Sequence, residues 1–107
     1  MKAQLTEDAV QDLRDIHEYI ARHDCVERAA QMLDGMETAI TGLSQFPQRG
    51  RYPPKLAALG ICEYREIVYN PYRILYRPMS DRFVVYVIAD GRRDFRSLLE
   101  RRLLRAT

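Results

Sequence analysis

The chain has 107 residues and a mass of 12.6 kDa, which suits one domain over residues 1–107 with a single modest core. Hydrophobic residues make up 47% and charged residues 30%, a composition that excludes a disordered chain. No apolar run is long enough to span a membrane and no signal peptide is recognisable, so we expect a cytoplasmic protein.

The two cysteines stand far apart in the chain. Cys25 and Cys62 lack the spacing of metal ligands, and without an export signal we expect reduced, packed thiols rather than a disulfide. The sequence predicts no metal site and no cofactor.

The net charge of +2 conceals an uneven distribution. Residues 1–50 hold five basic and nine acidic residues (5 − 9 = −4), whereas residues 51–107 hold twelve and six (12 − 6 = +6). A basic half predicts one surface for an acidic partner. The alternative, that the arginines are ordinary solvated residues, stays open.

The first helix of the chain is predicted after a short extended segment at residues 2–5. Thr6 is a good N-cap, and apolar residues then recur at helical spacing. This stripe consists of Ala9, Leu13, Ile16 and Ile20. Another face carries Asp8, Asp12 and Asp15, which we interpret as solvated surface.

A second amphipathic helix is predicted over residues 26–44. The connection at His23-Asp24 is short, so the two helices should form an antiparallel hairpin. Gly35 and Gly42 would permit close packing of the second helix.

The second half of the chain reads mainly as strands. After a loop at 46–54 and a helical turn at 55–60, we expect strands at 61–69, 72–77 and 82–89. Asn70-Pro71 joins the first pair, and the last strand is apolar on both faces, so it should be central or covered. Asp94 would cap a final helix through Leu104. The fold class is therefore α+β: an N-terminal strand, an antiparallel helical hairpin packed on a mainly antiparallel sheet of about four strands, and a short C-terminal helix, with the helices packed on one face of the sheet.

The strands at 64–77 carry arginine and tyrosine side by side, and another arginine pair follows at residues 92–93. Arginine offers five donors in a flat fork that suits phosphate or carboxylate, and tyrosine adds a stacking face. These strands therefore predict a surface for an anionic partner.

This order of elements and motifs resembles the RelE/ParE toxin superfamily of type II toxin–antitoxin modules, over nearly the whole chain. The motifs are Leu5-Thr6, Asp12-Leu13-Arg14-Asp15-Ile16, Tyr19-Ile20-Ala21, Phe46-Pro47 with Gly50-Arg51, Arg65-Glu66, Tyr72-Arg73-Ile74-Leu75-Tyr76 and Asp90-Gly91-Arg92-Arg93-Asp94.

RelE-like members are ribosome-dependent mRNA endonucleases, which need groups that move protons as well as cations. The resemblance aligns Arg73 and Arg93 with arginines that such nucleases use. The positions of their proton-handling residues hold Tyr64 and Glu66 here, and Leu98 or Leu99 near the C-terminus; His17 and His23 are remote in sequence. Glu66 is either a base or an ion-pair partner of Arg65. If the chain is a nuclease, the resemblance implies the site Arg65, Glu66, Arg73 and Arg93.

ParE-like members resemble the chain more closely, in the Tyr-Arg-Ile-Leu-Tyr strand and the Asp-Gly-Arg-Arg-Asp turn. They poison DNA gyrase by binding, which requires no catalytic residue. This branch implies a target-binding surface, for which we predict Arg65, Tyr72, Arg73, Tyr76, Arg77, Arg92, Arg93 and Arg96.

Toxins of this superfamily are held by an antitoxin whose C-terminal segment wraps them. The resemblance implies a toxin–antitoxin hetero-oligomer, with antitoxin contacts predicted at Val10, Ile16, Leu33 and Met36, although core packing is the alternative for most of these. A third possibility is a non-toxic domain that still binds its antitoxin.

Overall fold

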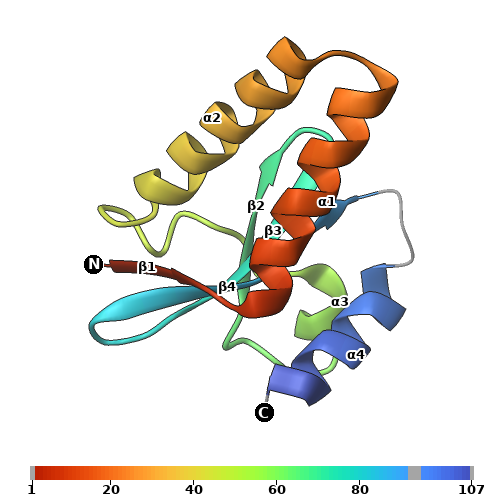
Figure 1. Ribbon diagram of the computed structural model, residues 1–107. Coiled ribbons are helices and arrows are strands. Elements are labelled where there is room, and N and C mark those ends of the chain that lie inside the picture. Colours follow the sequence, from red (N-terminus) through yellow and green to blue (C-terminus); the bar gives the residue numbers. More distant parts are fainter. Residues whose placement is uncertain (1, 92–94, 107) are drawn as a thin grey trace.

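The computed structural model describes residues 2–91 and 95–106 of the chain (Figure 1). The elements are β1 (Lys2–Leu5), α1 (Glu7–His23), α2 (Val26–Gly42), α3 (Pro54–Ala57), β2 (Arg65–Tyr69), β3 (Tyr72–Pro78), β4 (Arg82–Asp90) and α4 (Phe95–Ala106).

The four strands form one sheet in the order β1-β4-β3-β2. β1 runs parallel to β4, and the other pairs are antiparallel, which confirms the predicted mainly antiparallel sheet. β4 lies between β1 and β3 and is buried along most of its length, as its apolar sequence predicts. β2 is an edge strand, joined to β3 through Asn70 and Pro71 across a cis peptide bond.

The helical hairpin of α1 and α2 covers one face of the sheet. The Thr6 hydroxyl caps α1 by accepting a hydrogen bond of 3.1 Å from the backbone N–H of Ala9. The core under the hairpin contains Ala9, Met32, Met36, Ile40, Leu43, Ile74, Tyr76, Phe83, Val85 and Ile88. The apolar faces predicted for the two amphipathic helices therefore pack into the main core.

The opposite face of the sheet is covered as well. α3 and α4 lie next to each other there (Figure 1), and a second core cluster joins them to the sheet. It contains Leu56, Tyr64, Leu75, Val87, Ala89, Leu98 and Leu99. The prediction that the helices pack on one face of the sheet is therefore wrong for α3 and α4. β3 and β4 carry buried side chains on both faces of the sheet, so each face must be shielded from water.

An irregularity in β4 changes which side chains face the hairpin. Leu75 pairs with Val87, but Tyr76 pairs with Val85, so Tyr86 is the extra residue of a β-bulge. Val85 and Ile88 consequently both reach the hairpin core.

Several predicted boundaries differ from the structure. β2 begins at Arg65 rather than residue 61, and α2 ends at Gly42 rather than residue 44. Cys25 and Cys62 are free thiols, as expected, but Cys62 is exposed rather than packed. The predicted cap Asp94 lies outside the described residues. Among the described helices, none combines the length and the apolar character that crossing a bilayer requires.

Candidate functional site

Glu66 on β2 is a buried carboxylate held by two arginines. Arg51 donates to one carboxylate oxygen from Nε at 2.8 Å, and Arg73 donates to the other from Nε at 3.0 Å and Nη2 at 2.7 Å. The Glu66 side chain has no exposed surface, whereas that of Arg73 is 20% exposed and that of Arg51 63%. Both oxygens are engaged, so the ion-pair interpretation of Glu66 is confirmed.

The partner of Glu66 differs from the predicted one, Arg65. Successive residues of a strand point to opposite faces, so Arg65 and Glu66 diverge. Arg65 is paired across the sheet with Tyr76, and Glu66 with Leu75. Arg73, two residues from Leu75 on β3, lies on the same face as Glu66 and can reach it.

Arg65 instead attaches the loop at 46–52 to β2. Its Nη1 donates to the carbonyl oxygens of Gln48 at 3.3 Å and Gly50 at 2.8 Å, and its Nη2 donates to the Tyr52 hydroxyl at 2.9 Å. Its guanidinium carbon also lies 4.3 Å from the centroid of the Tyr52 ring. Arg65 therefore orders the loop as well as contributing charge.

Tyr76 supports the same loop from inside. Its hydroxyl donates to the carbonyl of Pro47 at 2.7 Å and accepts from the backbone N–H of Gly50 at 2.9 Å. The side chain is fully buried, and burial raises the pKa of Tyr76. Contrary to the prediction, Tyr76 offers no surface to a target.

The remaining predicted target-binding residues are not all placed by the structure. Tyr72 is half-buried against the hairpin core, and Arg77 lies beside Tyr64 on the opposite face. Burial raises the pKa of Tyr64, and the Arg77 guanidinium opposes that effect. Arg92 and Arg93 lie outside the described residues, and so does the side chain of Arg96.

The residues predicted to bind an antitoxin differ in how deeply they are buried. Met36 is fully buried, so the alternative of core packing is confirmed there, while Val10, Ile16 and Leu33 are half-buried. Ile16 lines a groove of about 580 Å³ between α1 and the adjoining ends of β3 and β4. The groove also includes Asp12, Asp15, Tyr19, Ile20, Pro71, Tyr72, Ile88, Ala89 and Asp90.

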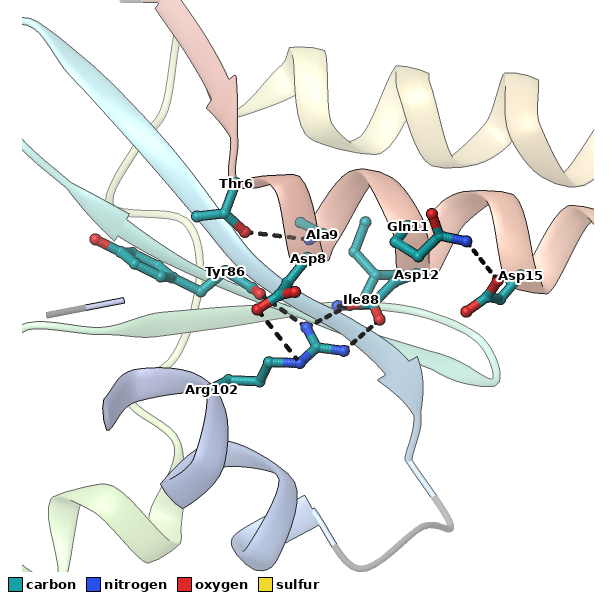
Figure 2. Close-up of polar contacts among 9 residues, drawn as sticks. All are labelled: Thr6, Asp8, Ala9, Gln11, Asp12, Asp15, Tyr86, Ile88 and Arg102. Carbon is teal, nitrogen blue, oxygen red and sulfur yellow. Dashed lines mark hydrogen bonds and ion pairs between the residues drawn. The ribbon is translucent and has the colours of Figure 1, made fainter. Parts of the chain in front are cut away.

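Asp12 ties three elements together (Figure 2). Arg102 of α4 donates to both Asp12 oxygens, from Nη1 at 2.9 Å and Nη2 at 2.5 Å, and from Nη1 to the Tyr86 carbonyl at 3.3 Å. Asp12 also accepts a hydrogen bond of 3.0 Å from the backbone N–H of Ile88, beside the bulge. The hydrogen bonds to Asp12 raise the pKa of Arg102, against the effect of burial.

The interpretation of Asp12 as solvated surface is therefore wrong. Its side chain is only 11% exposed, and that of Arg102 only 14%. The sequence does hold an indication of this role, because Asp12 lies three residues after Ala9 and four before Ile16, at the edge of the apolar stripe. Arg102 likewise follows Leu98 and Leu99 at helical spacing.

Among the described residues, neither histidine makes a hydrogen bond or an ion pair with an arginine of the sheet. Both lie on α1, and the His23 ring stacks on Tyr19 with 4.2 Å between the centroids. Across residues 2–91 and 95–106, no three His, Cys, Asp or Glu side chains gather as a metal ion requires.

Comparison with known proteins identifies the family. The family described as "ParE toxin of type II toxin-antitoxin system, parDE" matches residues 3–95. No curated protein matches the chain. A solved structure entitled "Chromosomal ParDE TA system from P. aeruginosa" is similar at a TM-score of 0.69 and 17% sequence identity, over 84% of this chain and 95% of that chain, and it shows that the fold is shared. An antiparallel hairpin on a four-stranded sheet and a match over most of its length together place this chain in the ParE toxin family of type II toxin–antitoxin systems.

Proposed function

We propose that this ParE-family toxin arrests growth by binding DNA gyrase and trapping it on cleaved DNA, and that a cognate antitoxin neutralises it. The observation that supports binding over chemistry is the state of Glu66, a buried carboxylate whose two oxygens both accept hydrogen bonds from arginines.

RNA cleavage through a ribose 2′-hydroxyl needs one group that accepts a proton and one that donates it. Glu66 has no exposed surface for a substrate hydroxyl. Burial raises the pKa of both Tyr64 and Tyr76, which makes proton loss from either phenol harder. Within the described residues, these observations favour a toxin that acts by binding.

The antitoxin is proposed to bind along the helical hairpin. Val10, Ile16 and Leu33 keep part of their apolar surface exposed on α1 and α2. An amphipathic helix laid on such a surface would bury these residues. Any antitoxin segment that meets the arginines of the loop and sheet should be acidic and apolar.

The gyrase proposal is tested with purified protein, gyrase, ATP and supercoiled plasmid. Linear DNA that carries covalently attached protein is expected, and it should disappear when the toxin is first mixed with its antitoxin. The absence of any effect on gyrase over a wide range of toxin concentrations would overturn the proposal.

Two further measurements separate the alternatives. Primer extension on translated mRNA would reveal cuts at codon positions if the toxin were a ribosome-dependent nuclease. Unimpaired colony formation after induction of soluble toxin without antitoxin would indicate a domain that only binds its antitoxin.

A further inference from the structure

We infer that the toxin binds its protein target through the loop surface, defined here as Phe46, Arg49, Arg51 and Val68, and that this surface receives an acidic, apolar segment of the target. The inference rests on the proposed function and adds to it the place of contact and the chemistry of the partner.

Exposed apolar side chains gather on this surface. Phe46 and Val68 are each 57% exposed, and they come from the loop and from the edge strand β2 that the loop joins. Val68 borders a hollow of about 400 Å³, whose lining also contains Ala39, Arg49, Gly50, Arg51, Glu66 and Ile67. Aliphatic side chains thus line a hollow that two guanidinium groups also border.

The loop surface is held rigid before any partner arrives. The backbone N–H groups of Arg51 and Glu66 each donate to the carbonyl of the other residue, at 3.0 and 2.8 Å. Arg65 and Tyr76 fix the carbonyls of residues 47, 48 and 50. A pre-ordered surface loses less conformational entropy on binding, which favours affinity.

The charge of two arginines remains available on this surface. The guanidinium of Arg49 lies 5.2 Å from the Phe46 ring centroid and makes no hydrogen bond or ion pair with a described residue. Arg51 uses only its Nε for Glu66 among the described residues, and its side chain is 63% exposed. The outer edges of both guanidinium groups can therefore receive carboxylates in a bidentate manner.

The composition favours a protein segment over nucleic acid. Arginine beside aromatic and aliphatic side chains is typical of the energetically dominant part of a protein interface, where lysine is depleted. A surface that follows a phosphate backbone needs a row of cations. Here the buried Glu66 offsets part of the local positive charge, and the whole chain has only two lysines, Lys2 and Lys55.

The test uses the gyrase cleavage assay to compare two double variants of the toxin that carry the same change in net charge. The double variant Arg49→Glu/Arg51→Ala alters the loop surface, and the control Arg22→Glu/Arg28→Ala alters exposed arginines of the hairpin. The loop variant should need about tenfold more protein to trap cleaved DNA, which is the loss expected for one important contact. The control should stay within about twofold of the wild type.

The variant Phe46→Ala separates a loss of binding from a loss of folding. The ring is exposed and contacts Arg49, so its removal should change the surface without unfolding the protein. It should also lower potency while the thermal unfolding midpoint stays near that of the wild type.

Full potency of the loop variant would overturn the inference and leave gyrase poisoning intact. Failure of the wild type to trap DNA would instead overturn the proposed function and this inference with it. Direct binding of the wild type to a labelled DNA duplex or single strand, lost in the loop variant, would assign the surface to nucleic acid and overturn the inference.

Discussion

Glu66 carries its charge into the protein interior, where a charge is costly unless it is paired and hydrogen-bonded. Arg51 and Arg73 supply both conditions, and in return the carboxylate fixes the direction of their guanidinium groups. One residue therefore links the loop, β2 and β3.

Replacing Glu66 with Gln keeps the shape of the side chain and removes its charge. Arg51 and Arg73 would then both lose their ion pair with the buried carboxylate, and we expect a loss of about 3–5 kcal/mol in the free energy of unfolding, measured with urea. The control Asp81→Asn breaks an exposed pair with Arg82 and should cost less than about 0.5 kcal/mol. Equal stability of both variants would contradict the structural role of Glu66.

Tyr76 makes stability depend on pH in the alkaline range. Burial raises the pKa of Tyr76, so the unfolded chain loses this proton at a lower pH than the native protein does. The free energy of unfolding should be unaffected by this group below about pH 10 and fall as the pH rises through the native pKa.

Tyr76→Phe should remove that part of the alkaline decrease. At neutral pH it should also cost about 1–3 kcal/mol, because the N–H of Gly50 and the carbonyl of Pro47 lose a buried partner. Urea unfolding at about pH 7 and about pH 11 measures both effects. Tyr64 shares the direction of the shift, so some alkaline decrease should persist in this variant.

Among the elements, α2 approaches the sheet closely at one glycine. A Cβ atom at Gly35 would overlap the hydroxyl and ring of Tyr69 on β2. The prediction of close packing at Gly35 is confirmed.

Gly35→Ala should therefore destabilise the protein, although the same change in an exposed helix normally stabilises by about 1 kcal/mol. The matched control is Gly42→Ala, where a Cβ would lie 3.3 Å from the flexible end of Arg49. We expect a lower thermal unfolding midpoint for the first variant and little change for the second. A midpoint of Gly35→Ala above that of the wild type would show that the hairpin can shift without cost.

α4 is attached to the rest of the molecule by apolar packing and by the ion pair of Arg102 with Asp12. Because the pair is mostly buried, removing Arg102 leaves the charge of Asp12 without its counter-ion and the carbonyl of Tyr86 without this donor.

Arg102→Met should lower the free energy of unfolding by about 3–5 kcal/mol and reduce the hydrogen-exchange protection of α4. Arg101→Met, on the exposed side of the same helix, is the control and should change neither quantity. The double variant Asp12→Leu/Arg102→Met should recover part of the loss, and a double-mutant cycle measures this coupling. Strict additivity would mean that the pair does not hold α4.

At the scale of the whole molecule, charge is segregated. Acidic residues dominate residues 1–50, which form the hairpin, and basic residues dominate residues 51–107, which form the strands β2 to β4 and part of the loop surface. Such a distribution steers an acidic partner toward the basic side and makes association depend on salt.

Trapping of cleaved DNA by the toxin should therefore weaken as the salt concentration rises, because exposed charges are screened beyond about 10 Å at 0.1 M salt. Potency is measured over a salt series and normalised to a small-molecule gyrase poison. The variant Arg49→Glu/Arg51→Ala should show a shallower dependence. A dependence as steep as that of the wild type would place the steering charges elsewhere on the toxin.

The periodic pattern of apolar residues in the sequence is sufficient to predict most of the helices and strands. α1, β3 and β4 lie within about two residues of their predicted bounds, because each element has a regular apolar pattern of its own. The start of β2 was misplaced because Ile61 and Tyr64 are apolar for a different reason: they pack with α3 and α4 without being part of a strand.

The sequence by itself determined the α+β class, the helical hairpin and the central position of β4. Only the tertiary structure decided that Glu66 pairs with Arg51 and Arg73, that Tyr76 is internal, and that Asp12 holds α4. A pattern along one element reveals which of its faces is apolar, but not which other element covers that face. Asp12 and Arg102 are 90 residues apart, and they meet because two helices pack near the same bulge of β4.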